Sequence, residues 1–293
     1  MKHTKGEKVF QVFNIIIMLL VCCLMVYPYL NQVAISFNEG IDAMKGGIGI
    51  FPREFTWANY KAIFSTKSMY TGAVVSVSIT VLHTLLCLVV LFASAYGITR
   101  RGLPYRRGLT LFLMLPCYVS AGVVPTYIIY RYLGLINSYW IYILPGCFSF
   151  YNMVILRSFL QELPASIEES AKLDGANDIQ IMYKIALPLS KPVLATITLW
   201  VAVGRWNNWT DAMMYITDRK LFPLSYIMMQ LIKESSLAQQ MADDSGMITS
   251  VAKPTPDTIK AATLVVTTLP IIMVYPFLQK YFIKGVTLGA VKG

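Results

Sequence analysis

The chain has 293 residues, of which 56% are hydrophobic and 14% are charged, and its mean hydropathy is +0.57. Soluble domains usually carry about 25% charged residues, so a soluble fold of this size has no interior for so much apolar side chain. The formal net charge is +10, but the basic residues form short clusters beside hydrophobic runs and no nucleic-acid-binding motif. Composition therefore predicts a multi-spanning integral membrane protein and argues against a nucleic-acid-binding domain.

The N-terminal segment begins MKHTKGEK and continues into an apolar run from residue 9 to about residue 30. This run is too long for a typical signal-peptide core and lacks a convincing cleavage site, so we interpret it as a retained first span. The cysteines lie in apolar runs without metal-ligand spacing, and we expect them to be membrane-embedded hydrophobes. They are Cys22, Cys23, Cys87, Cys117 and Cys147.

A transmembrane helix needs about 20 mostly apolar residues. Stretches of this kind lie at about 9–33, 70–98, 108–130, 138–160, 192–216 and 260–283. The fifth is the least apolar, because it contains Arg205, Asn207, Asn208 and Asp211. The sequence therefore predicts an all-α integral membrane protein with six transmembrane helices, in which residues 1–293 form a single domain.

The orientation of the chain follows from its lysines and arginines. The tight turn RRGLPYRRG at residues 100–108 holds four arginines and is expected to stay in the cytoplasm. Six spans then place both termini inside. Two outside segments are long, 31–69 and 217–259, and Thr56 begins a plausible short helix in the first of them. Such loops can contact an external partner or act as simple connectors, and the sequence favours neither.

The segment 161–192, QELPASIEESAKLDGANDIQIMYKIALPLSKP, is a polar loop between two predicted spans. Pro164 suits the first turn of a helix, and Glu168 and Glu169 follow near its positive end. Gly175 can end this helix, because glycine readily adopts the left-handed conformation.

The predicted helix is amphipathic. Ile167, Ala171 and Asp174 fall on one face, and Ala171 is small enough to permit close approach. A second helical stretch follows at 178–187, and two prolines lead into the fifth span. The pattern predicts a short helix on the cytoplasmic membrane surface. Taken alone, the pattern favours an ordinary connector between spans over an element that passes a partner's push into the bilayer.

The same loop resembles the EAA motif of ABC importer permeases, in which E-A-A, three residues and G are followed by nine residues and I-x-L-P. Here Glu169-Ser170-Ala171 and Gly175 are followed by Ile185-x-Leu187-Pro188. Ser170 stands where the family usually has alanine, and both residues are small.

The resemblance covers most of the chain and is to carbohydrate permeases of the maltose-transporter type. It includes AYGITR at 95–100, Leu-Pro at 115–116, LGLIN at 133–137 and WNxW at 206–209. The tail at 275–282, 284–286 and 289–293 is similar to a branch that serves larger oligosaccharides, among them uronate-containing fragments of pectin or alginate.

The resemblance implies a type I ABC importer permease in a bacterial inner membrane, with both termini cytoplasmic. It implies a second homologous permease subunit, two cytoplasmic ATPase subunits, an extracytoplasmic solute-binding protein and an oligosaccharide substrate. The loop would be a coupling helix seated in an ATPase cleft, and the rocking of this helix would switch the access of the pore.

Carried over to this sequence, the coupling role falls on Glu168, Glu169, Ala171, Asp174 and Gly175. Glu169 would pair with a basic group, Ala171 would permit close packing, and Gly175 would set the turn. The sequence has no GxxxxGK[ST] phosphate loop. We therefore expect no catalytic residue, no metal site and no directly bound cofactor, with ATP and magnesium used by the partner ATPase.

Polar residues within spans are expensive and often functional. Tryptophan faces stack on sugar rings, amides bond hydroxyl groups, and Arg205 would suit a uronate carboxylate. For Arg205 we favour pairing with an acidic group instead, and the tryptophans also suit the membrane interface. A lone membrane histidine such as His83 more often forms a hydrogen bond between helices than acts as a ligand. The candidate substrate path comprises Tyr118, Tyr127, Asn152, Arg205, Trp206, Asn207, Asn208 and Trp209.

An ion-coupled secondary transporter is the main alternative function. That class usually needs buried carboxylates or broken helices for its coupling ion. Asp211 is the available carboxylate, and the EAA-like loop would have no role. A membrane enzyme is less well supported, because the sequence has no HExxH or GxSxG motif and no paired membrane carboxylates.

Overall fold

A computed structural model describes residues 5–65, 67–100, 102–245 and 254–290. These residues form helices, connecting loops and one isolated β-bridge between Asn38 and Phe55. The chain divides into two compact units. The first consists of Met1–Tyr70 and Ile227–Leu269, and the second of Thr71–Tyr226 and Pro270–Gly293.

Three helices in the described residues are long and apolar enough to cross a membrane without a break. They are α1 (Lys5–Ser36), α4 (Lys67–Thr99) and α14 (Pro256–Ala290), and they cover the first, second and sixth predicted spans. Pro256 begins α14, where its missing N–H group costs nothing. The last residues of the predicted family-like tail, 291–293, lie outside the described residues.

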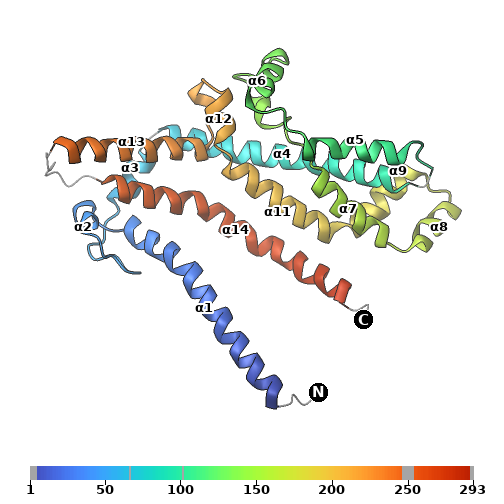
Figure 1. Ribbon diagram of the computed structural model, residues 1–293, viewed down its shortest axis with the longest axis horizontal. Coiled ribbons are helices and arrows are strands. Elements are labelled where there is room, and N and C mark those ends of the chain that lie inside the picture. Colours follow the sequence, from blue (N-terminus) through green and yellow to red (C-terminus); the bar gives the residue numbers. More distant parts are fainter. Residues whose placement is uncertain (1–4, 66, 101, 246–253, 291–293) are drawn as a thin grey trace. The chain divides into compact units, whose positions relative to one another are not determined.

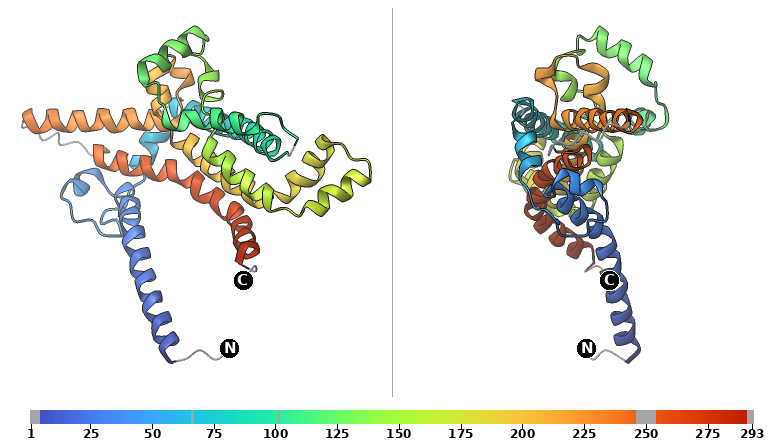
Figure 2. Two further views of the ribbon diagram at one scale, coloured as in Figure 1. Left: turned by 45° about the vertical axis from the view of Figure 1, so that its right-hand side comes forward. Right: turned by 90° about the vertical axis from the view of Figure 1, so that its left-hand side faces the viewer.

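The third predicted span is two helices rather than one. Helices α5 (Arg106–Tyr118) and α6 (Val123–Tyr132) meet at 117°. Pro116 lies in the last turn of α5, and Gly122 caps α6 with a φ of +79°, a value that favours glycine. Figures 1 and 2 show that the break turns α6 away from the line of α5.

The fifth predicted span, 192–216, is interrupted near its end. Before it, the loop helices Asp178–Leu189 meet α11 (Lys191–Asn207) at a 77° bend. Helix α11 ends where Asn208 becomes extended, and α12 (Thr210–Tyr215) follows. A 3-10 turn (Arg219–Leu221) then leads to α13 (Leu224–Ser245), so the predicted outside segment 217–259 is helical over much of its length.

The fourth predicted span, 138–160, is not a continuous helix. A 3-10 turn (Tyr139–Tyr142) and a loop precede α7 (Phe150–Glu162), which has 13 residues. A helix of that length rises about 20 Å, less than the roughly 30 Å of a hydrocarbon core. The described residues thus hold three unbroken candidate spans, or five if each bent pair is one span, and the count of six stays a prediction.

The core of the second unit lies among α4, α7 and α11, which run side by side in Figure 1. Ala95 is fully buried, so its small side chain lets the neighbouring helices approach α4 closely. Lipid tails are as apolar as these side chains, so packing contacts rather than escape from water hold such helices together. The buried residues include Leu91, Ala95, Met153, Leu156, Val193 and Ile197.

In the first unit, the loop after α1 folds into a compact cap with α2 (Gly40–Met44) and α3 (Ala58–Phe64). The predicted helix from Thr56 is therefore present and begins two residues later. The side-chain oxygen of Asn38 accepts hydrogen bonds from the backbone N–H groups of Arg53, at 2.8 Å, and Glu54, at 2.9 Å. The amide group of Asn38 donates to Asp42 Oδ2 at 2.9 Å.

Asp42 connects the parts of this cap. Arg53 Nε donates to its carboxylate at 2.9 Å, and a second guanidinium nitrogen donates to the backbone oxygen of Asp42 at 3.0 Å. These bonds, with that of Asn38 as the largest cause, lower the pKa of the Asp42 carboxyl. The cap is therefore held by buried polar contacts rather than by a regular sheet.

We predict that Asn38→Leu loosens the cap. The change leaves two backbone N–H groups without their acceptor, which costs about 1–3 kcal/mol when such groups are buried. Hydrogen exchange of the segment 37–57 should become faster in the purified protein. Glu54→Gln is the matched control, because the Glu54 side chain is exposed. Equal exchange in Asn38→Leu and the parent protein would contradict this role.

Candidate functional site

Helix α8 (Ala165–Leu173) is the first element of the polar loop 161–192. Pro164 is its N-cap, so the proline precedes the first turn rather than lying in it as predicted. Glu168 lies in the first turn, where the exposed N–H groups of a helix favour a negative charge. The short helix that the sequence predicts is therefore present.

Helix α8 ends in a Schellman motif. Gly175 has a φ of +80°, and its N–H group donates to the backbone oxygen of Lys172 at 3.0 Å. The N–H group of Ala176 donates to the oxygen of Ala171 at 2.9 Å. These two bonds define the motif and require a left-handed residue at Gly175, as the sequence predicts.

After Gly175, a new helix begins at Asp178. Asn177 and Gln180 form a capping box, in which each side chain bonds the backbone N–H group of the other at 2.8 Å and 3.0 Å. Helix α9 (Asp178–Ile181) continues through a π-helical turn (Met182–Ala186) into α10 (Leu187–Leu189) and α11. The predicted second helical stretch, 178–187, is therefore helical throughout.

Arg100 ties this loop to the end of α4. Its two terminal nitrogens donate to both carboxylate oxygens of Glu168, at 2.8 Å and 2.6 Å. The guanidinium group also stacks on the ring of Tyr96, with 4.0 Å between its carbon and the ring centroid. A bidentate bond with a stacked face fixes the orientation of both partners, which a lysine would not do.

Tyr96 forms a second contact between α4 and the loop. Its hydroxyl group donates to the backbone oxygen of Asp178 at 3.1 Å, so α4 holds the loop on both sides of the Gly175 turn. The hydrogen bonds from Arg100 lower the pKa of the Glu168 carboxyl. The ion pair therefore persists above the ordinary pKa of a glutamate and is lost only as the pH falls through the lowered value.

The predicted coupling residues divide into two groups. Glu168 is engaged by Arg100, and Ala171 is 8% exposed and packed inside the chain. Glu169, Asp174 and Gly175 are exposed. Two apolar residues that sequence reasoning did not single out are also exposed, Leu173 by 89% and Ile179 by 66%. An apolar side chain so exposed beside exposed carboxylates is a surface suited to a partner.

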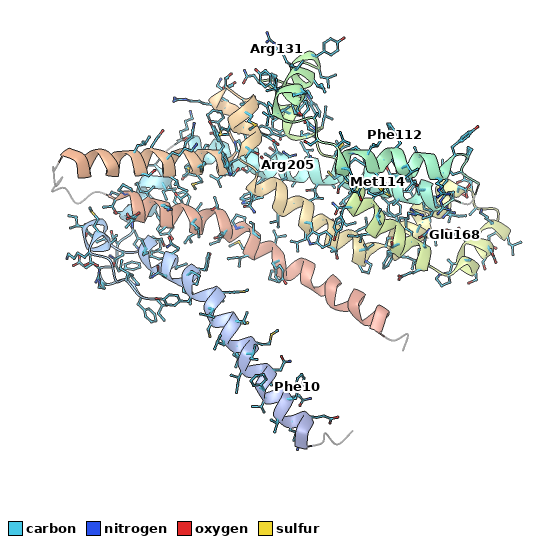
Figure 3. The ribbon with its side chains drawn as sticks, in the orientation of Figure 1. Phe10, Phe112, Met114, Arg131, Glu168 and Arg205 are labelled. Carbon is cyan, nitrogen blue, oxygen red and sulfur yellow. The ribbon has the colours of Figure 1, made fainter. Side chains whose placement is uncertain are left out.

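Arg205 lies at the end of α11 away from Glu168 (Figure 3). It donates to Asp211 Oδ2 at 2.7 Å, and Asn208 donates to the same oxygen at 3.2 Å. The side chain of Arg205 is 7% exposed. The structure therefore shows the pairing with an acidic neighbour that we favoured for Arg205, and this pair satisfies a charge that would be costly within a membrane.

His83 faces the same region from α4. Its Nδ1 atom is 2.9 Å from the backbone oxygen of Ile143, so the ring bonds α4 to the loop before α7. Beside Arg205 lies a pocket of about 190 Å³. Its lining comprises His83, Gly146, Trp200, Val201, Gly204, Arg205 and Asn208.

The other candidate path residues are spread over several elements. Tyr118 is 79% exposed at the end of α5, and Asn152 is partly buried in the first turn of α7. Tyr127 in α6 stacks on Tyr215 of α12, with ring centroids 6.1 Å apart. Asn207 is exposed, and Trp206 and Trp209 are partly buried.

Tyr215 is a residue that the sequence analysis missed. It contacts both Tyr127 and Tyr130, the latter with centroids 5.2 Å apart. The spacing of three residues between the α6 tyrosines places them on one helix face and was a detectable signal. Their partner was not detectable, because α12 reaches α6 only through the tertiary fold.

Comparisons with known proteins identify the family and the fold of the chain. Residues 90–288 match the family described as binding-protein-dependent transport system inner membrane component. The chain is similar to protein LplC of Bacillus subtilis (strain 168), with 39% identity over 100% of this chain and 98% of that protein. It is also similar to the polygalacturonan/rhamnogalacturonan transport system permease protein YtcP of the same strain, with 38% identity over 96% of this chain and 97% of that protein.

A solved structure is also similar, that of a bacterial ABC transporter involved in the import of the acidic polysaccharide alginate. The TM-score is 0.85 at 26% identity, covering 96% of this chain and 99% of that chain. The predicted resemblance is thus confirmed. This chain belongs to the family of binding-protein-dependent transport system inner membrane components and has the fold of a type I ABC importer permease.

Proposed function

We propose that the chain, as a single permease domain over residues 1–293, forms half of a heterodimeric pore in an ATP-driven importer of an acidic oligosaccharide. Its partners would be a second homologous permease, two ATPase subunits that use ATP and magnesium, and an extracytoplasmic solute-binding protein. The observation that carries the proposal is the attachment of α8 to α4 through Arg100 and Glu168.

The exposed side of the loop is the proposed ATPase contact. It presents Glu169, Leu173, Asp174 and Gly175, none of which is buried within the chain. Leu173 would enter an apolar part of the ATPase cleft, and Glu169 would meet a basic group. Glu168 and Ala171 have a different part in this scheme, because they hold α8 to its own subunit.

The attachments of α8 explain how a push on it would reach the pore. Helix α7 continues into α8 through Leu163 and Pro164, and α9 leads through α10 into α11. Arg100 adds α4. A displacement of α8 would therefore move three helices of one packed core together, and a packed core deforms little.

The pairing of Asp211 weakens the alternative of an ion-coupled transporter. That class usually needs buried carboxylates or broken helices for its coupling ion, and Asp211 follows the helix break after α11. Asp211 is, however, bonded by Arg205 and Asn208. The polar cluster at the end of α11 is better suited to holding α11, α12 and the loop at Pro145 in place.

The proposed substrate class rests on the relatives. One is named for polygalacturonan and rhamnogalacturonan and another for alginate, and these polymers carry uronate carboxylates. The exposed Tyr118 and the α6 tyrosine Tyr127 are proposed to stack on sugar rings along the path. Trp206, Asn207, Asn208 and Trp209 are proposed to contribute where α11 gives way to α12.

We predict that Glu169→Lys reduces transport by at least about tenfold, equivalent to about 1.4 kcal/mol. The reversed charge would repel the basic group proposed on the ATPase. Copurification of the ATPase subunits and uptake of oligosaccharide are the measurements. Glu162→Lys is the control, an equally exposed glutamate at the end of α7. The coupling role is wrong if Glu169→Lys leaves both measurements unchanged.

We predict that Arg100→Lys and Tyr96→Phe lower the sugar transported per ATP hydrolysed while the ATPase subunits remain bound. Lysine keeps the charge but loses the bidentate bond, worth about 1 kcal/mol for a partly exposed pair. The double variant Arg100→Glu with Glu168→Arg should transport more sugar per ATP hydrolysed than Arg100→Glu alone. Lys172→Ala is the control, because Lys172 and Asp178 are both exposed and 3.7 Å apart. An unchanged ratio in Arg100→Lys would argue against transmission through α4.

We predict that an oligogalacturonide inhibits uptake through the assembled importer more strongly than the same oligosaccharide with its carboxylates reduced to hydroxymethyl groups. The comparison changes the charge but keeps ring number and linkage. Competition against a labelled acidic oligosaccharide in proteoliposomes measures the difference. Equal or stronger inhibition by the reduced sugar would assign a neutral oligosaccharide as substrate.

A further inference from the structure

A basic pocket lies between the start of α5 and α7. It has a volume of about 360 Å³ and is lined by Arg106, Arg107, Thr110, Leu111 and Arg157. Two of its arginines come from the first turn of α5 and the third from α7, so the pocket depends on the packing of two helices. Its lining is mostly apolar, as the long stems of arginine side chains and Leu111 supply.

The guanidinium groups of these arginines have no partner within the described residues. No ion pair or hydrogen bond joins the guanidinium group of Arg106, Arg107 or Arg157 to another described group, and the Thr110 hydroxyl donates only to the backbone oxygen of Arg106, at 2.8 Å. The Nε atoms of Arg157 and of Arg100 are both buried without a hydrogen-bond partner. Arg100 and Arg205, in the same unit, each bind a carboxylate. A cluster of like charges with a buried unpaired donor is unfavourable unless an anion joins it.

The position of the pocket points to the membrane surface. Arg106, in the arginine-rich turn at 100–108, begins α5, and Arg100 of the same turn contacts Glu168 of the polar loop. The turn and the loop therefore share one end of the unit, the end that the positive-inside rule predicts to be cytoplasmic. On α5, Leu111 of the pocket is 53% exposed, and the next residue, Phe112, labelled in Figure 3, is 67% exposed.

We propose that this pocket binds the phosphate group of an anionic phospholipid of the cytoplasmic leaflet, with one acyl chain along the exposed apolar side of α5. The guanidinium groups supply several donors in the fork geometry that suits phosphate. The unbonded backbone N–H groups in the first turn of α5 add to the positive potential. The cytoplasmic leaflet is rich in anionic lipids, and basic pockets between membrane helices bind their head groups.

The test uses the full-length chain in detergent, titrated with phosphatidylglycerol, phosphatidylcholine or inorganic phosphate, with binding followed by native mass spectrometry. Phosphatidylglycerol should bind well above the other two. Each arginine changed to glutamine should weaken its binding about fivefold, the effect of about 1 kcal/mol per basic residue at an anionic surface. The variants are Arg106→Gln, Arg107→Gln, Arg157→Gln and their combination.

The matched control removes the same charge from exposed basic residues elsewhere in the unit, as Arg131→Gln, Arg219→Gln and Lys220→Gln. It should bind phosphatidylglycerol like the parent chain. Arg157→Lys keeps the positive charge, and it replaces the combined variant in the test if that variant does not fold. Equal binding of phosphatidylcholine, equal binding of inorganic phosphate, or an unchanged affinity in the combined variant would each overturn the proposal.

Discussion

The bidentate bond between Arg100 and Glu168 is the contact on which the organisation of the second unit depends. Helices as short as α8 and α9 are not stable alone, because nucleating a helix costs more than a few hydrogen bonds return. Arg100 supplies the missing tertiary support by stacking on Tyr96 and binding the first turn of α8. The loop consequently has one position relative to α4, α7 and α11, which a device that transmits force requires.

The arginines at the two ends of the second unit differ in their burial and in their acidic partners. At the end of α11, Arg205 is almost fully buried and bound to Asp211, because an unpaired charge at such depth would be expensive. Near the loop, Arg100 is partly exposed and bound to Glu168, while the three pocket arginines form no ion pair with any residue that the structure describes. An arginine without a protein partner is tolerable where an anionic membrane surface can serve as the partner.

The interrupted helices have a common physical explanation. Backbone groups freed by a break must find partners inside the protein, because a hydrocarbon core offers none. The break after α11 is satisfied in this way: the Asn208 side chain accepts from the N–H group of Asp211 at 3.1 Å, and Ser225 donates to the Asn208 backbone oxygen at 3.0 Å. Breaks of this kind are known in transporters, where unwound segments supply polar groups to substrate and ion sites.

The sequence by itself determined the membrane class, three of the spans, and the helix–glycine–helix pattern of the loop at 161–192, because hydropathy and the conformational freedom of Gly175 are local properties. The EAA-like spacing also identified the family. Tertiary structure alone decided that 108–130 and 138–160 are broken, because hydropathy does not register backbone direction. It also decided that Glu168 and Ala171 face their own subunit while Glu169 faces outward. That division depends on Arg100, 68 positions away in the chain, which no local pattern connects to the loop.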